Sequence, residues 1–138
     1  FGRVWLYPWC HTREPAPHRA EHLAATTVAL AAANRIAGTE AYRSLPAAAL
    51  EAPMGGTSVD FAYGALGCVH SYVVELPPSP PRGGLLLATI RGLLTGDPKR
   101  WWREAMNPPA TMATAAGNEM AAALEALAEH VLAGRGVA

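Results

Sequence analysis

The hydrophobic and polar positions along the 138-residue chain predict strands that alternate with helices. The short apolar and aromatic run Val4–Tyr7 indicates a buried strand. An alanine-rich segment with apolar residues near helical spacing predicts a helix over residues 17–36, which Gly38 ends. The run Cys68–Leu76 is rich in β-branched and aromatic residues and predicts a second strand, which a proline-rich stretch ends.

The remaining segments give weaker patterns. Residues 39–61 read as irregular, with a short helical turn at Ala47–Leu50, and residues 85–90 fit a strand or the start of a helix. The segment 99–106 predicts a short amphipathic helix, and a final helix is predicted over residues 118–132. One face of that final helix carries Met120, Leu124, Leu127 and Val131. Strands that alternate with helices predict an α/β layered fold.

Composition narrows the classes of function. Lys plus Arg and Asp plus Glu both number 11, so the chain lacks the positive charge typical of nucleic-acid-binding proteins. With 51% hydrophobic and 16% charged residues, the chain is not kept unfolded by excess charge. No apolar run reaches the ~18–20 residues of a transmembrane helix. Two cysteines are too few for a disulfide scaffold, so we expect Cys10 and Cys68 to be buried apolar residues.

Glu75 is the most informative polar residue because it ends an otherwise apolar strand. In open α/β sheets, ligands bind at the carboxyl ends of strands, and a carboxylate desolvated there works as a general base. On strand alternation, Glu75 shares a face with Ser71 and Val73. The alternative is an exposed glutamate at a solvent-rich strand end, and the pattern alone leaves both interpretations open.

Three further motifs each have a structural alternative. His18-Arg-Ala-Glu-His22 fits the H-x-x-E-H pattern of a zinc peptidase, or is a polar first turn on a helix surface. Pro77–Arg82 fits the P-x-x-P-x-R pattern of a ligand for aromatic-grooved modules, or is a stiff loop. Lys99–Arg103 suits nucleic acid or a membrane surface, or is an amphipathic helix whose tryptophans pack inward. For such short patterns we favour the structural interpretation.

Four segments then occur in a recognisable order: FGRVWLYPW at residues 1–9, GGTSVDFAYG at 55–64, SYVVEL at 71–76 and GLL at 84–86. With the closing helix, this order resembles the C-terminal part of the catalytic domain of zinc metallocarboxypeptidases of the pancreatic carboxypeptidase A/B type. The resemblance covers residues 1–87 and 109–132, and residues 88–108 read as an insertion. It implies a partial three-layer α/β/α fold with a mixed sheet, in which residues 1–138 form the C-terminal portion of one catalytic domain.

That family hydrolyses the last peptide bond of peptides and proteins, so the resemblance implies peptide C-termini as substrates. Glu75 falls on the family's catalytic glutamate, the base that activates a zinc-bound water. Val59 falls on the residue at the base of the specificity pocket, where an acid selects basic C-terminal residues. Valine there implies a preference for apolar or aromatic ones. Further walls of the pocket fall on Leu50, Pro53 and Val73.

The family's zinc ligands do not fall on this chain. One histidine ligand is expected two residues before Phe1, and a His-x-x-Glu pair is expected farther upstream. We therefore expect Phe1 not to be the true start, and the localisation stays open. Glu51 stands near the position of the family's mobile substrate-binding tyrosine, and Pro77 replaces an arginine of pancreatic members. These departures keep a second interpretation open, a non-catalytic truncated relative that acts as a binding or structural module.

Overall fold

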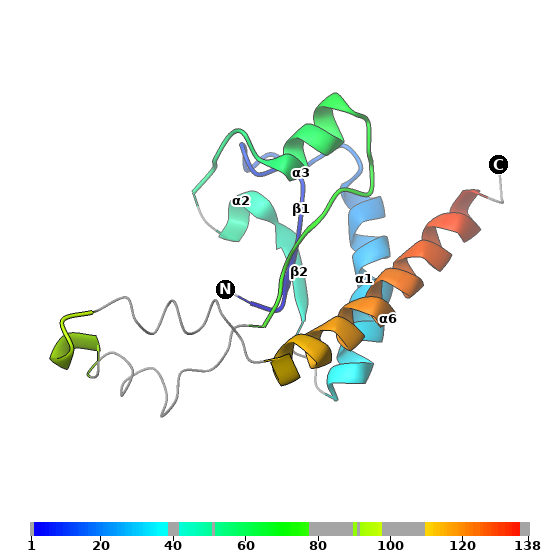
Figure 1. Ribbon diagram of the computed structural model, residues 1–138. Coiled ribbons are helices and arrows are strands. Elements are labelled where there is room, and N and C mark those ends of the chain that lie inside the picture. The colour runs from blue at the N-terminus through cyan, green and yellow to red at the C-terminus, as the bar shows by residue number, and fades with distance from the viewer. Residues whose placement is uncertain are drawn as a thin grey trace.

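The computed structural model describes residues 2–38, 42–50, 52–77, 90, 92–97 and 110–135. Their core is a three-stranded sheet in the order β2-β1-β3, with helices on both sides of it (Figure 1). β1 (Val4–Tyr7) lies in the centre, parallel to β2 (Arg43–Pro46) and antiparallel to β3 (Val73–Glu75). The predicted α/β fold with a mixed sheet is confirmed.

The central strand β1 is buried along its whole length. Val4 and Leu6 point into one apolar cluster, while Trp5 points into a second cluster on the opposite face. Because side chains alternate along a strand and both faces of this sheet are covered, every position of β1 is apolar or aromatic. This explains why the sequence shows a continuous apolar run here.

On the face of Trp5, two long helices pack against each other and against the sheet. α1 (Arg19–Ala37) ends at Gly38, whose φ of 67° lies in the left-handed region that favours glycine. The helix predicted over residues 17–36 is therefore confirmed with small shifts at both ends. α6 (Ala110–Arg135) crosses α1, as Figure 1 shows. Ala29 and Ala33 of α1 are fully buried, and their small side chains permit the close approach.

The final helix differs from the prediction in length and in the face it buries. α6 begins at Ala110, eight residues before the predicted start, and ends at Arg135. Leu124, predicted on the buried face, is 54% exposed. The buried positions are instead Ala116, Glu119 and Ala123, because the alanine-lined surface of α1 accepts small side chains along the contact line. Met120 and Leu127 flank that line and are partly buried, as predicted.

On the other face of the sheet, short helices cover Val4 and Leu6. α2 (Ala47–Leu50) confirms the predicted helical turn, and α3 (Ser58–Asp60) leads into the π-helical turn η1 (Phe61–Ala65). Leu66 N–H donates to the carbonyl of Phe61 at 3.2 Å, five residues back, as expected for that geometry. The cluster on this face consists of Val4, Leu6, Cys10, Ala47 and Val59.

The sequence pattern missed one strand and predicted another that is too long. β2 lies within residues 39–61, which were predicted to be irregular. The strand predicted over residues 68–76 shrinks to β3, because hydrogen bonds outside the sheet hold the backbone before it. Cys68 N–H donates to the Ala62 carbonyl at 2.9 Å, and Ser71 Oγ donates to the Val59 carbonyl at 3.0 Å. Cys68 is also exposed, not buried, whereas Cys10 is buried as predicted.

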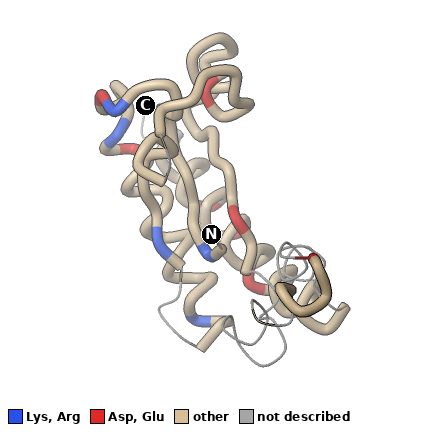
Figure 2. The backbone as a smooth tube through the Cα atoms, turned by 90° about the vertical axis from the view of Figure 1, so that its left-hand side faces the viewer, with Lys and Arg blue, Asp and Glu red and all other residues tan. Residues whose placement is uncertain are grey.

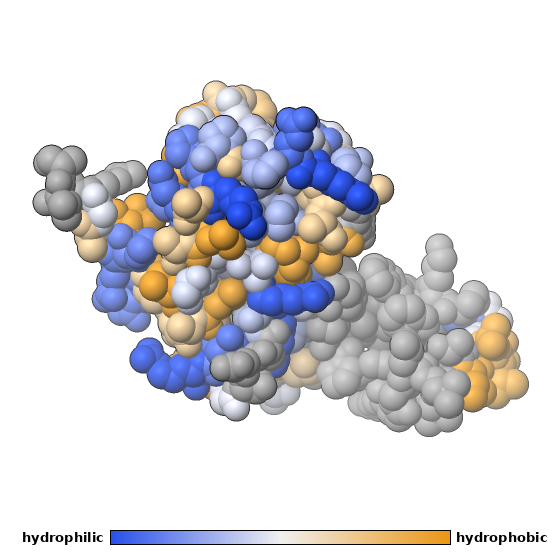
Figure 3. Space-filling model, turned by 180° about the vertical axis from the view of Figure 1, so that it is seen from behind, coloured by the Kyte–Doolittle hydropathy of each residue, from blue (hydrophilic) through white to orange (hydrophobic). Residues whose placement is uncertain are grey.

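Several predictions fall on residues outside the described ranges. These are the proline-rich loop after Pro77, the element over residues 85–90 apart from Ile90, the amphipathic helix over 99–106, and most of the insertion at 88–108. In the part of the chain that the structure describes, no helix is long and apolar enough to span a membrane. Acidic and basic positions are interspersed along the described backbone (Figure 2), and from behind apolar patches alternate with hydrophilic ones (Figure 3).

Candidate functional site

Glu75 lies at the carboxyl end of β3 and is partly buried. In the register of the sheet it is opposite Val4, while Val73 is opposite Leu6. Glu75 therefore belongs to the sheet face that carries Val4, Leu6 and the cluster beneath them. The backbone N–H of Gly2 donates a hydrogen bond to Glu75 Oε2 at 3.1 Å. A backbone donor of this kind fixes the direction of the carboxylate.

The predicted pocket residues mostly gather on this same face. Val59 is 3% exposed and belongs to the buried cluster, and Leu50 and Val73 are partly buried and pack against it. Pro53 is exposed and is not a member of that cluster. Glu51 lies outside the described residues. The structure thus brings together Val59, Leu50 and Val73 on the sheet face that carries Glu75, and leaves Pro53 apart.

Asp60, next to Val59, anchors this region, and the sequence analysis missed its role. Its carboxylate accepts hydrogen bonds from the backbone N–H groups of Cys10 at 2.8 Å and His11 at 2.9 Å. His11 Nδ1 lies 2.7 Å from Asp60 Oδ2 and donates a third bond. These bonds tie the segment after β1 to α3 and so hold Val59 in place. The sequence offered only an aspartate next to an apolar residue, and that pairing is equally common on protein surfaces.

The segment after β1 also lines one side of a cavity of about 670 Å³. Trp9 and Phe61 contribute aromatic rings to it, and Asp60 contributes its carboxylate. Gly64 lies against the Trp9 ring so closely that a Cβ at this position would be 3.0 Å from a ring carbon. A larger residue at position 64 would therefore displace Trp9.

The H-x-x-E-H motif does not form a metal site. His22 is fully buried, and its Nε2 donates to the Val69 carbonyl at 2.8 Å. His18 Nδ1 instead pairs with the Tyr63 hydroxyl at 2.8 Å, and Glu21 is exposed. The expected polar surface turn is thus wrong for His22, which links α1 to the segment before β3. Across residues 2–77 with their gaps and the later described ranges, no three His, Cys, Asp or Glu side chains gather to hold a metal ion.

Burial of His22 makes stability depend on pH. Desolvation lowers its pKa below the ordinary 6.5, and Nδ1 has no hydrogen-bond partner among the described residues. The unfolded chain therefore binds a proton more readily than the folded one, so the stabilisation from neutral His22 is complete above pH 6.5 and is lost as the pH falls toward the lower folded value. We expect the free energy of unfolding to fall between neutral pH and about pH 5, by at most ~1.4 kcal/mol per pH unit for this one group, and the melting temperature to fall with it.

A matched pair of variants isolates this effect. His22→Gln removes the titrating group and should flatten the pH dependence, whereas His130→Gln on α6 should leave it unchanged. Thermal unfolding followed by circular dichroism at several pH values measures both. An equally steep dependence in His22→Gln would contradict the assignment.

Comparison with known protein families matches residues 1–110 to the zinc carboxypeptidase family. No curated protein matches the sequence significantly. The family match spans well over half of the chain and includes Glu75 and Val59, which packs in the cluster on the sheet face that carries Glu75. The residues that the structure describes do not themselves supply a zinc-binding set, so the donors for this metal are not found among them. The chain belongs to the zinc carboxypeptidase family.

Proposed function

We propose that this chain is the C-terminal portion of a zinc carboxypeptidase catalytic domain that removes apolar or aromatic C-terminal residues from peptides, with Glu75 as general base. The observation that carries the proposal is the position of Glu75 on the same sheet face as Val73, the face on which Val59 of α3 and Leu50 of α2 also pack. A base beside apolar side chains is the arrangement that hydrolysis next to an apolar C-terminal residue requires.

In this proposal Glu75 handles the proton. It accepts a proton from the attacking water and passes it to the nitrogen of the leaving amino acid. The Gly2 N–H, 3.1 Å from Oε2, holds the carboxylate in one orientation for both transfers. The zinc of the family supplies Lewis-acid polarisation when it is bound. We expect its ligands upstream of Phe1.

The chemistry of the cluster supports the substrate preference. Val59, Leu50 and Val73 offer no charged or hydrogen-bonding side-chain atom, and a cation buried among them would lose its hydration without compensation. We therefore expect kcat/KM for peptides ending in Phe or Leu to exceed that for peptides ending in Lys or Arg by at least about 100-fold. Steady-state kinetics with matched peptides on the full-length protein measure the ratio.

Variants at Val59 sharpen this test. Val59→Asp should raise the relative activity on basic C-termini, while Val59→Asn, which has the same size and no charge, should not. A wild-type protein that prefers basic C-termini would contradict the proposed pocket, whether or not the variants fold.

The first test of the proposed function is to determine the coding sequence that precedes Phe1. The second is to measure the zinc content of the expressed full-length protein. We expect a histidine two residues before Phe1, a His-x-x-Glu pair farther upstream, and one zinc ion per protein. A reading frame that opens close to Phe1 would overturn the proposal. That result would favour the non-catalytic relative, an interpretation that Glu51 near the position of the family's substrate-binding tyrosine also supports.

A further inference from the structure

A buried acidic residue lies where the last helix meets the start of the sheet. Glu119 of α6 is 5% exposed, and its carboxylate joins two residues from distant parts of the chain. The Tyr42 hydroxyl donates to Glu119 Oε2 at 2.6 Å, and Arg3 Nη2 lies 3.6 Å from Oε1. The guanidinium carbon of Arg3 is also 5.6 Å from the centre of the Tyr42 ring. We refer to Glu119, Tyr42 and Arg3 as the Glu119 cluster.

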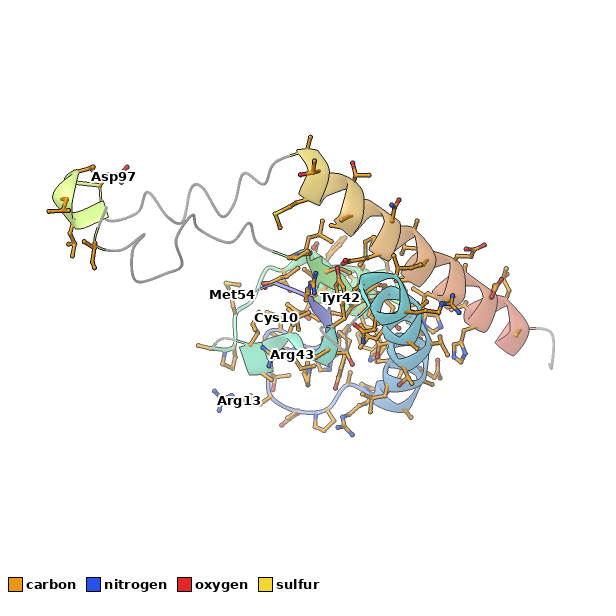
Figure 4. All side chains as sticks on the ribbon, turned by 90° about the horizontal axis from the view of Figure 1, so that it is seen from below. Cys10, Arg13, Tyr42, Arg43, Met54 and Asp97 are labelled. Carbon is orange, nitrogen blue, oxygen red and sulfur yellow. The ribbon has the colours of Figure 1, made fainter. Side chains whose placement is uncertain are left out.

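The cluster is built as one unit. Burial and the hydrogen bond to Glu119 raise the pKa of Tyr42 well above its usual value, so its hydroxyl stays protonated and remains a donor. Asn34 of α1 fixes the backbone of Tyr42, whose N–H donates to Asn34 Oδ1 at 2.9 Å. Tyr42 lies in the interior of the described body, as Figure 4 shows. A carboxylate that is bonded to both Tyr42 and Arg3 restricts the movement of the two backbone segments that carry them.

What the cluster holds is the turn that precedes β1. Arg3 has a φ of 53°, in the left-handed region that residues with a Cβ rarely adopt, and Gly2 before it has a φ of 81°. Such a conformation persists where its surroundings impose it. Here the Arg3 side chain is held by Glu119, and the Arg3 carbonyl accepts a hydrogen bond from Arg43 N–H at 3.1 Å.

The same turn presents its backbone N–H to the proposed base. Gly2 N lies 3.1 Å from Glu75 Oε2, one residue away from the Arg3 side chain that Glu119 holds. We propose that Glu119 is a positioning residue for Glu75 and acts through the Gly2–Arg3 turn. This inference rests on the proposed function for its catalytic consequence, but the structural link can be tested separately. It assigns a role to α6, nearly all of which lies beyond the residues matched to the family.

A packing role alone predicts a different outcome. If Glu119 served only to fill the space between α6 and the sheet, a side chain of equal size would replace it without affecting Glu75. Glutamine has that size and still accepts from Tyr42, but it lacks the charge that attracts Arg3. Glu119→Gln therefore separates packing from positioning.

The test uses the full-length protein, with Glu125→Gln on the exposed side of α6 as the matched control. We expect Glu119→Gln to lower kcat about tenfold with little change in KM. In hydrogen-exchange NMR, exchange of the Gly2 amide should accelerate about tenfold more than that of the β1 amides. Arg3→Gln, at a partly exposed position, should reproduce both effects, and the double variant should be no worse than either single one.

The outcomes are distinguishable. Uniform acceleration across β1, or an unchanged Gly2 amide, would overturn the positioning role whatever the activity. Local acceleration with an unchanged kcat in an active enzyme would overturn the link to Glu75. A wild-type protein without peptidase activity would overturn the proposed function, whereas a local response of the Gly2 amide would still support the structural link.

Discussion

Replacing Glu75 with glutamine should lower kcat for peptide hydrolysis by about 10²–10⁴-fold, the usual contribution of a general base. Glutamine keeps the size of the side chain, and its amide oxygen still accepts from the Gly2 N–H, so the fold should be maintained. What is lost is the capacity to take a proton from the attacking water. Steady-state kinetics of the full-length variant, with zinc content measured in parallel, test this expectation.

The control for this prediction is Glu125→Gln. This change removes an exposed carboxylate of α6, a helix that is distant in sequence from β3. That variant should keep wild-type kcat and KM. Retained activity in Glu75→Gln would contradict the role of general base. Loss of zinc in the same variant would assign Glu75 to metal binding rather than to proton transfer.

Truncating Trp5 to alanine should lower the free energy of unfolding by about 3–5 kcal/mol, a large loss for a single substitution. Trp5 is 1% exposed and lies between Ala29 and Ala33 of α1, Ala123 of α6 and the ring of Tyr72, whose centre is 5.7 Å away. Alanine would leave a cavity where the sheet meets both long helices. Urea unfolding followed by circular dichroism measures the change.

Trp5→Phe provides the comparison. The Nε1 of Trp5 has no hydrogen-bond partner among the described residues, so phenylalanine gives up ring volume but no polar interaction. We expect its loss of stability to be clearly smaller than that of the alanine variant. Equal losses in the two variants would show that the indole N–H, and not the filling of the interface, dominates.

The elements that the sequence predicts well are those whose pattern reflects their own burial. β1 is buried on both faces and reads as a continuous apolar run, and α1 carries its small residues at helical spacing. β2 was missed because Arg43–Pro46 shows no alternation, and its extended shape comes from parallel pairing with β1. The strand predicted over residues 68–76 was too long because hydrogen bonds to η1 and α1 override the strand propensity of its first residues.

The candidate site depended on a different kind of information. Strand pattern alone singled out Glu75 but left its role open, and Val59, Leu50, Pro53 and Val73 came from the family resemblance. Three of these four pocket positions lie together in the structure, while their role in substrate binding stays a prediction. Asp60, Glu119 and His22 were missed or misjudged because a polar residue held by distant partners reads in sequence like an ordinary exposed one.

The order of the elements along the chain also bears on biosynthesis. β1 is synthesised before the elements that cover it: its partner β3 begins at Val73, and α6, which covers Trp5 together with α1, begins at Ala110. A nascent chain on the ribosome therefore exposes an apolar strand until its last described helix has emerged. Contacts of such wide sequence separation slow folding and favour aggregation of incomplete chains. We therefore expect early folding of this chain to depend on protection of residues 4–7 by other parts of the protein or by chaperones.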